Sequence, residues 1–292
     1  MRACWAAPPR WTTTSTAAAT WTLAPPHPPA ASSPKVERVE LAFEAIGDGP
    51  PVVLLHGLFA SAASWRGVAR ALADSHRVLS VDLRNHGRSP RAISMAYTEM
   101  ADDVLSLIER ESLGRAAVIG HSVGGKVAMA LALSAPYAVG RLAVIDIAPA
   151  AYLEQWGQQL RAMHDAATGL GPAPAHGADP LSASEMLAEI LLPRAATRNA
   201  HVDWRSHLPA IALSLPELCN FPGLLRYLRS DAALHAIVGA RSPCVSPASA
   251  AAFAPMFPNA SVEVIPDAGH WVHADQPHAL VASLRRALAT CH

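Results

Sequence analysis

From Lys35 onward, short apolar runs alternate with longer amphipathic ones along the chain. Apolar runs of roughly four to eight residues are typical of buried strands, whereas apolar positions that recur three or four residues apart indicate helices. The predicted strands are Val36–Phe43, Val52–His56, Val78–Asp82, Ala116–Gly120, Leu142–Ile147, Leu234–Gly239 and Ser261–Ile265. The predicted helices are Ala62–Ala73, Tyr97–Leu113, Val123–Ala135, Ser249–Met256 and Gln276–Ala289. Such alternation favours an α/β fold, in which helices cover a mostly parallel central sheet.

Two parts of the chain depart from this alternation. In Val36–Phe43 apolar residues alternate with polar ones, which predicts an antiparallel strand at the edge of the sheet. Residues 151–230 contain no predicted strand, but helical stretches separated by a segment rich in Gly and Pro. These stretches are Tyr152–Ala167, Ala183–Leu192 and Leu224–Leu228. We therefore expect a core of residues 35–150 and 231–292, with residues 151–230 folded over the sheet as a helical cap.

Residues 1–34 differ in composition from the rest of the chain. They are rich in Pro, Ala, Ser and Thr, and no acidic residue occurs before Glu37. We expect an N-terminal extension outside the fold, either disordered or derived from an upstream start site. Arg2, Arg10 and the many hydroxyls faintly resemble an organellar transit peptide, although the prolines would interrupt its amphipathic helix. The expected location is therefore the cytoplasm, with the mitochondrion as the alternative.

Composition narrows the range of partners. Lys plus Arg number 23 and Asp plus Glu also number 23, so no basic field is available for a nucleic acid. No apolar stretch reaches the ~18 residues of a membrane span. The four cysteines, Cys4, Cys219, Cys244 and Cys291, are scattered and form no C-x-x-C, which argues against a disulfide framework and a zinc site. They are expected to be free thiols in a reducing compartment.

The pentapeptide Gly120-His121-Ser122-Val123-Gly124 lies where a predicted strand meets a predicted helix. A G-x-S-x-G sequence in this setting predicts a sharp turn that exposes a nucleophilic serine. The glycines let neighbouring backbones pass closely, which a side chain would obstruct. Because the pattern also occurs in ordinary glycine turns, its position between strand and helix is what favours Ser122 as a nucleophile.

A serine hydroxyl needs a base within hydrogen-bonding reach, and in a strand–turn–helix site of this kind the base comes late in the chain. His270 is the strongest candidate among 14 histidines, because it stands on a turn after the predicted strand Ser261–Ile265. His121, His273 and His278 are expected to be surface or supporting imidazoles instead.

The third member of such a triad is a carboxylate. Residues 240–246, which follow the last predicted strand but one, contain none. Asp146 ends an apolar strand at the sheet edge expected for Ser122 and His270. Since a buried carboxylate is costly unless it is paired, we favour Asp146 as the partner of His270. Asp231 is the alternative, and a structural Asp146 that binds backbone amides also stays open.

Acyl transfer also needs hydrogen-bond donors for the developing oxyanion. One is expected to be the backbone N–H of Val123, directly after the nucleophile, and the other a backbone N–H in the loop that follows an early strand. Leu58 is the predicted second donor, with Phe59 as its neighbour. Phe59 and Trp271 are predicted to contact the substrate.

Other polar residues near these loops are interpreted as structural. His56 is expected to brace the oxyanion loop by hydrogen bonding rather than to react, and the polar segment Asp82–Pro90 is expected to act as a second brace. No cofactor and no metal site are predicted, because the sequence contains no G-x-G-x-x-G after a strand, no Walker pattern and no ligand cluster with metal spacing.

Four motifs resemble those of the α/β-hydrolase superfamily, over roughly residues 35–290. They are His56-Gly57, Asp82-x-Arg84-x-His86-Gly87-x-Ser89, Gly120-His121-Ser122-x-Gly124-Gly125-Lys126 and Gly269-His270-Trp271. The chain also resembles a narrower group, the YbfF-type bacterial esterases and their mitochondrial abhydrolase-domain relatives. The motifs that carry this resemblance are Asn85-His86-Gly87, Lys126, Asp146-Ile147-Ala148-Pro149 and Gly269-His270-Trp271-Val272-His273-Ala274. The resemblance implies the α/β-hydrolase fold, an acid at Asp146, and esterase or thioesterase activity under a helical cap. Departures at Gly239-Ala240-Arg241-Ser242 and in Gly169–Pro180 imply that substrate preference differs from the relatives.

The leading hypothesis is a serine hydrolase that cleaves carboxylic esters or thioesters of small acyl substrates through an acyl-serine intermediate. The same triad also serves carbon–carbon bond hydrolysis and perhydrolysis, and these are the alternative reactions. A catalytically silent ligand-binding module is the alternative from another class, and the intact candidate triad argues against it. The sequence predicts no particular oligomeric state.

Overall fold

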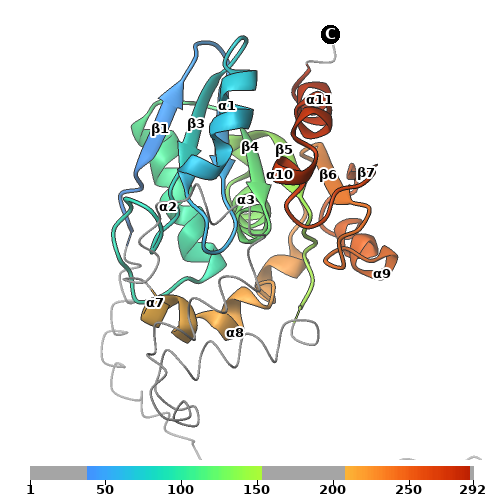
Figure 1. Cartoon of the computed structure of the whole chain (residues 1–292). Coiled ribbons are helices and arrows are strands. Elements are labelled where there is room, and N and C mark those ends of the chain that lie inside the picture. The colour runs from blue at the N-terminus through green and yellow to red at the C-terminus, as the bar shows by residue number, and fades with distance from the viewer. Residues whose placement is uncertain (1–37, 153–207, 290–292) are drawn as a thin grey trace, which may run out of the picture. The chain divides into compact units, whose positions relative to one another are not determined.

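The computed structural model describes residues 38–152 and 208–289. Within these ranges a seven-stranded sheet has the order β1-β3-β2-β4-β5-β6-β7 (Figure 1). The strands are β1 (Phe43–Ile46), β2 (Pro51–Leu55), β3 (Arg77–Val81), β4 (Ala116–His121), β5 (Val139–Ile145), β6 (Leu234–Gly239) and β7 (Ser261–Ile265). The β1 strand is antiparallel to β3, and all other neighbouring strands are parallel. The predicted α/β fold with an antiparallel edge strand is confirmed.

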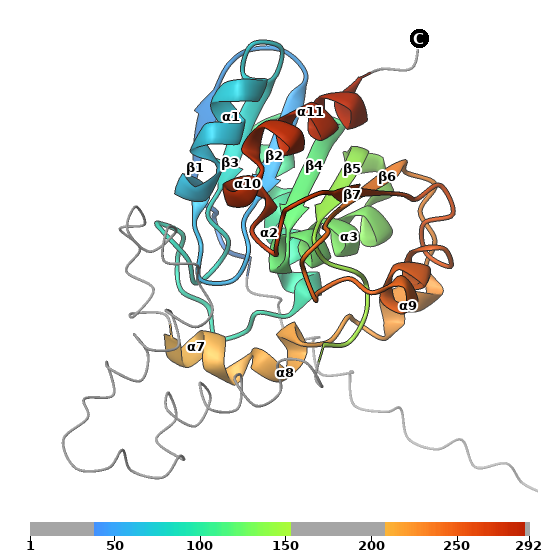
Figure 2. The same cartoon turned by 45° about the vertical axis from the view of Figure 1, so that its right-hand side comes forward.

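Helices cover both faces of this sheet (Figure 2). They are η1 (Ala62–Trp65), α1 (Arg66–Leu72), α2 (Tyr97–Arg110), α3 (Val123–Ser134), η2 (Pro136–Ala138), α7 (Leu208–Leu213), α8 (Leu215–Leu218), η4 (Leu224–Tyr227), α9 (Pro247–Ala250), η5 (Ala251–Phe253), α10 (Val272–Asp275) and α11 (Pro277–Leu288). Helices α1 and α11 pack together on one face, and α2 packs with α3 on the other. Two separate apolar cores result, one on each side of the sheet.

Helix α3, which follows the proposed nucleophile, is buried on every side. All of its residues from Val123 to Leu133 are buried, and they are mostly Ala, Gly, Val and Leu. A helix that is apolar all round belongs in a protein core. Because α3 is enclosed between the sheet and α2, the turn at its N-terminus is held on a rigid element.

The first strand is displaced from its predicted range, Val36–Phe43. The observed strand starts where the prediction ended, at Phe43. Val39 is buried as its pattern suggested, but its N–H donates to Asp103 Oδ1 at 2.7 Å instead of to a neighbouring strand. The N–H of Ala42 likewise donates to Ser89 Oγ at 2.8 Å. The alternating pattern therefore reflects the burial of a segment without regular secondary structure. Side-chain acceptors, rather than a neighbouring strand, bind its backbone N–H groups.

The described part of the predicted cap comprises residues 151–152 and 208–230. It contains α7 and α8, which the sequence analysis did not predict, and η4 in place of the predicted helix Leu224–Leu228. This segment is tied to the core: Tyr97 Oη donates to Leu218 O at 2.7 Å, and Met95 N donates to Ser214 Oγ at 3.1 Å. Residues 153–207, with most of the predicted cap helices, lie outside the described residues, so a complete cap stays a prediction.

The remaining helices differ from their predicted ranges at their ends. The predicted helix Ser249–Met256 is divided into the short α9 and η5, and the predicted Gln276–Ala289 corresponds to α11 with an additional turn, α10, before it. Across the described ranges, no helix combines the length and the apolar character needed to cross a membrane. The N-terminal residues 1–34 lie outside the described residues.

Candidate active site

Ser122 occupies a strained turn between β4 and α3. Its backbone has φ 51° and ψ −119°, a conformation that costs a non-glycine residue about 1–3 kcal/mol. Hydrogen bonds hold the turn: Ser122 N donates to Ile145 O at 3.0 Å, and Gly125 N donates to Ser122 O at 2.9 Å. The predicted steric role of the glycines is visible, since a Cβ at Gly120 would lie 2.2 Å from Gly124 O, and one at Gly124 would lie 2.4 Å from Leu55 O.

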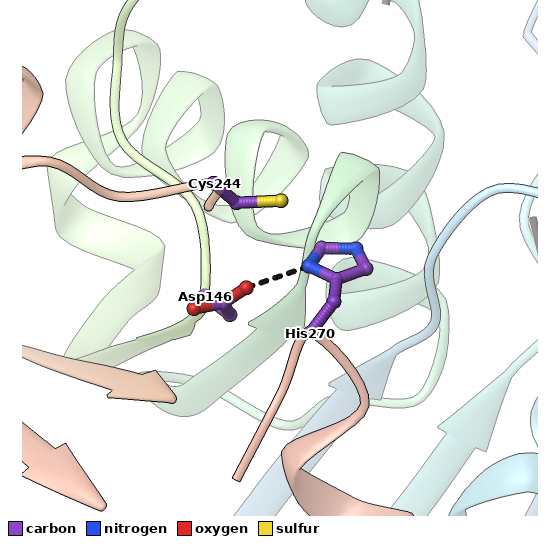
Figure 3. Close-up of side chains that lie close together, drawn as sticks. All are labelled: Asp146, Cys244 and His270. Carbon is purple, nitrogen blue, oxygen red and sulfur yellow. Dashed lines mark hydrogen bonds and ion pairs between the residues drawn. The ribbon is translucent and has the colours of Figure 1, made fainter. Parts of the chain in front are cut away.

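The structure brings Asp146 and His270 together at the carboxyl edge of the sheet, where the turn of Ser122 also lies. Asp146 follows β5, whose backbone continues to pair with β6 through a 2.7 Å bond from Asp146 N to Ile237 O. The chain then turns at Asp146, with φ 53°. Its carboxylate accepts a 2.6 Å hydrogen bond from His270 Nδ1, which comes from the loop after β7 (Figure 3). Nδ1 therefore carries a proton, and Nε2 is the ring nitrogen that remains for a base.

The loop after β6 supplies donors to Asp146 rather than a carboxylate of its own. Gly239 N donates to Asp146 Oδ1 at 3.1 Å, and Ser242 Oγ donates to Asp146 Oδ2. With His270, these partners satisfy a carboxylate that is fully buried. Ser242 was not among the predicted site residues, because a hydroxyl in a loop carries no distinguishing signal. The alternative acid, Asp231, precedes β6, lies 84% exposed and pairs with Arg229 at 3.6 Å.

The charge on His270 is governed by its neighbours. Burial alone would lower the pKa of His270, but the hydrogen bond to Asp146 and the adjacent Cys244 raise that pKa to about 9. The imidazolium form is therefore stabilised at neutral pH. Such stabilisation is what a base needs after it has taken a proton from a nucleophile.

His121 supports the loop that carries His270. Its Nε2–H donates to the backbone oxygen of His270 at 2.9 Å, and its ring lies 4.7 Å from the His270 ring and 5.1 Å from the Trp271 ring. Burial lowers the pKa of His121 well below its usual value, so this imidazole stays neutral. The expected supporting role of His121 is consistent with these contacts.

A largely apolar cavity of about 120 Å³ unites these elements. Ser122 and His270 both line it, together with the predicted oxyanion donors Leu58 and Val123. No hydrogen bond joins the hydroxyl of Ser122 to His270 in the described ranges, and such bonds often tighten only when substrate is bound. The remaining lining residues are Gly57, Phe59, Tyr97, His121, Lys126, Ile147, Tyr152, Leu215, Leu218, Cys219, Cys244 and Trp271.

In the predicted oxyanion loop, the backbone of Leu58 differs from that of its neighbour Phe59. Phe59 has φ 61°, and its N–H donates to His86 Nε2 at 3.2 Å, so this amide is already engaged. The same bond directs the loop so that Leu58 and Phe59 both reach the cavity. The structure thus places the predicted substrate contacts, Phe59 and Trp271, on the cavity wall.

The predicted braces, His56 and Asp82–Pro90, make the expected kind of contact. His56 Nε2 accepts from Leu83 N at 3.0 Å, which leaves Nδ1–H to donate to Gly57 O at 2.7 Å. Asp82 Oδ1 accepts from Ala62 N at 2.7 Å. Burial lowers the pKa of His56 to about 4, so the ring stays neutral in this role.

Lys126 lines the cavity and joins α3 to the end of α8 and the residues that follow it. Its Nζ donates to Asn220 O at 2.7 Å, with longer contacts to the carbonyls of Leu218 and Cys219. It also lies 4.7 Å from the centre of the Tyr152 ring. Burial lowers the pKa of Lys126 to about 7.

The chain belongs to the α/β-hydrolase superfamily. A family model described as the alpha/beta hydrolase fold matches residues 50–277. This match confirms the superfamily to which the sequence motifs pointed.

Curated relatives agree with the narrower resemblance. The chain is 35% identical to the sn-1-specific diacylglycerol lipase ABHD11 of Xenopus tropicalis over 83% of this chain and 79% of that protein. It is 32% identical to the esterase YbfF of Escherichia coli over 82% of this chain and 92% of that protein. A solved structure of a marine microorganism esterase superposes with a TM-score of 0.71 at 27% identity, covering 86% of this chain and all of that one. YbfF-type and abhydrolase-domain proteins are thus its relatives.

Proposed function

We propose that this chain hydrolyses carboxylic esters of small acyl substrates through an acyl-serine intermediate. Ser122 Oγ attacks the ester carbonyl while His270 Nε2 accepts the hydroxyl proton, and Asp146 holds the imidazole in the required tautomer. The backbone amides of Leu58 and Val123 stabilise the oxyanion. His270 then gives the proton to the leaving alcohol, and a water molecule, activated by the same base, releases the acid.

One observation carries this proposal. His270, held by its 2.6 Å bond to Asp146, lines the same cavity as Ser122 on its strained turn, although the three residues come from loops after different strands. A strained serine, an imidazole with a fixed tautomer and a nearby pair of amides together serve acyl transfer. Independently of these residue roles, its superfamily and its esterase relatives identify the chain as a carboxylic ester hydrolase.

The cavity suggests which acyl groups fit. Its lining is mainly apolar, and its volume of about 120 Å³ is small. A short, uncharged acyl chain would bury apolar surface there without desolvating a charge. We expect short-chain esters to be better substrates than long-chain ones, and thioesters of the same acyl groups to react at the same serine.

A fluorophosphonate probe tests the nucleophile directly. We expect labelling at Ser122, located by peptide mass spectrometry, and turnover of short p-nitrophenyl esters that the probe abolishes. A panel of acyl esters and acyl-CoA thioesters of increasing chain length then measures preference, with Ser122→Ala as the blank. Turnover that survives in Ser122→Ala, or labelling of another residue, would contradict the proposal.

A further inference from the structure

Cys244 places a thiol beside the Asp146–His270 pair. It follows β6 on the loop that also carries Ser242, is 4% exposed, and lines the cavity together with His270. Figure 3 shows its Sγ directed toward the imidazole. One donor atom from each of Asp146, Cys244 and His270 lies within 4.8 Å of the other two. A thiol and an imidazole on the cavity wall thus meet a buried carboxylate directly behind them.

This donor set suits a thiophilic divalent cation. Zn²⁺ is bound by thiolate sulfur at about 2.3 Å, by imidazole nitrogen at about 2.0–2.1 Å and by carboxylate oxygen at about 2.0–2.2 Å. Around a tetrahedral ion those distances put the ligand atoms about 3.3–3.6 Å apart. For an ion to bind, the His270–Asp146 contact of 2.6 Å would have to widen and the thiol to approach. The fourth position would be left for water from the cavity.

We propose that Asp146, Cys244 and His270 form an inhibitory site for Zn²⁺ or a similarly thiophilic cation, which enters through the substrate cavity. The ion takes the lone pair of His270 Nδ1, so the proton on Nδ1 is released to solvent and the one proton left on the ring lies on Nε2. The Cys244 thiol releases its proton to solvent and binds as thiolate. His270 can then no longer accept the proton of Ser122, and Asp146 no longer orients the ring.

Cys219, the other buried cysteine that lines the cavity, differs from Cys244 in its neighbours. The neighbour of Cys219 is the basic side chain of Lys126 rather than a carboxylate and an imidazole. Within the described ranges, Asp146, Cys244 and His270 are the group that has the donor atoms for a metal ion. Cys219→Ala is therefore a matched control for Cys244→Ala: each removes one buried thiol from the same cavity.

Co²⁺ titration tests the site without reference to activity. Co²⁺ bound to a thiolate shows a charge-transfer absorption band, and we expect this band in the wild type, Cys219→Ala and Ser122→Ala but not in Cys244→Ala. Zn²⁺ should displace it at one equivalent. Circular dichroism and the thermal midpoint of each variant check folding, and Cys244→Ser supplies a second variant of similar size. A band that persists in both Cys244 variants, or none in the wild type, would overturn the site.

Inhibition gives the second readout and rests on the proposed esterase function. The Zn²⁺ concentration that halves ester hydrolysis, taken relative to the zinc-free rate of each variant, should rise at least about 10-fold in Cys244→Ala and stay unchanged in Cys219→Ala. Mg²⁺, which prefers oxygen ligands, should not inhibit. If the chain proves inactive on every ester, the Co²⁺ band still decides the site, so the two proposals fail separately.

Discussion

His56 and His270 are both largely buried imidazoles on loops at the carboxyl ends of parallel strands, yet their partners differ. Backbone groups of Leu83 and Gly57 bind both nitrogens of His56, and its pKa falls to about 4. A carboxylate binds one nitrogen of His270, and the pKa of His270 rises to about 9. The first ring is a neutral brace and the second a candidate base. Burial does not determine the chemistry of a histidine; the group that faces it does.

Replacing each histidine with alanine should separate these two roles most strongly. We expect His270→Ala to lower kcat by about 10⁴–10⁶-fold, the scale seen when the base of a serine protease is removed, with little change in unfolding free energy. His56→Ala should leave buried backbone groups unpaired and cost about 1–3 kcal/mol of stability for each, with a much smaller loss of kcat per folded molecule. Initial rates and urea unfolding measure both. Equal losses of kcat in two folded variants would remove the distinction.

The carboxylate that faces His270 should have the next largest effect. In Asp146→Asn the side-chain amide donates to Nδ1 and forces the ring proton onto Nε2, and the corresponding change in a serine protease costs about 10⁴ in turnover. Asp231→Asn is the matched control, because the Asp231 side chain is 84% exposed and its carboxylate pairs with Arg229 rather than with a histidine. We expect its turnover to equal that of the wild type. Mild, equal effects of the two changes would show that the acid lies elsewhere.

The pH dependence of kcat/KM should reflect the protonation of His270 and not that of His56. A base must be neutral to accept a proton, so kcat/KM should rise with pH, about 10-fold per unit, up to the pKa of His270. Because that pKa is raised from 6.5 to about 9, we expect the midpoint on the alkaline side of 6.5. His56, with a pKa lowered to about 4, stays neutral throughout this range. The Ser122→Ala rate at each pH corrects for spontaneous hydrolysis.

Two variants test which neighbours set the midpoint of this pH profile. Asp146→Asn and Cys244→Ala each remove a neighbour that raises the pKa of His270, so the residual activity of each should show a midpoint at lower pH than the wild type. The shift should be larger for Asp146→Asn, which loses a full negative charge. A wild-type midpoint at or below 6.5 would contradict the stabilising role assigned to Asp146.

The sequence predicted those parts of the molecule that follow from periodicity and strand order. Strands β6 and β7 have their predicted bounds, because each is a compact apolar or alternating run between turns. The proximity of Asp146 and His270 followed from the rule that parallel strands end at one edge of a sheet. The first strand was placed wrongly, because burial of Val39 against α2 imitates the alternation of a strand.

Contacts between loops could not be predicted from the sequence. Nothing in the local sequence of Ser242 indicates that its hydroxyl meets Asp146, 96 residues away. The engagement of the Phe59 amide by His86, and the approach of Cys244 to His270, depend on loop conformations that no periodicity encodes. Ligand spacing along the chain accordingly gave no sign of the Asp146–Cys244–His270 cluster, because its members come from three separate loops.

The hydrogen bond from Ser242 to Asp146 should have the smallest effect on kcat, and its removal tests whether the donors around Asp146 contribute to catalysis. In Ser242→Ala one donor is lost, while Gly239 N and His270 Nδ1 remain. A hydrogen bond to a charged group contributes about 1.5–3 kcal/mol, but only the part that strengthens in the transition state affects rate. We therefore expect kcat to fall about 10-fold with KM nearly unchanged.

Two further variants separate positioning from packing at this loop. Ser242→Thr keeps the hydroxyl and should restore most of the lost kcat, whereas a purely structural serine would tolerate the extra methyl group no better than the loss of its oxygen. Ser246→Ala removes an exposed cap of α9 from the same loop and should leave kcat unchanged. If Ser242→Ala lowers the thermal midpoint but not kcat, Asp146 needs only its backbone donor to act, and the hydroxyl serves the fold alone.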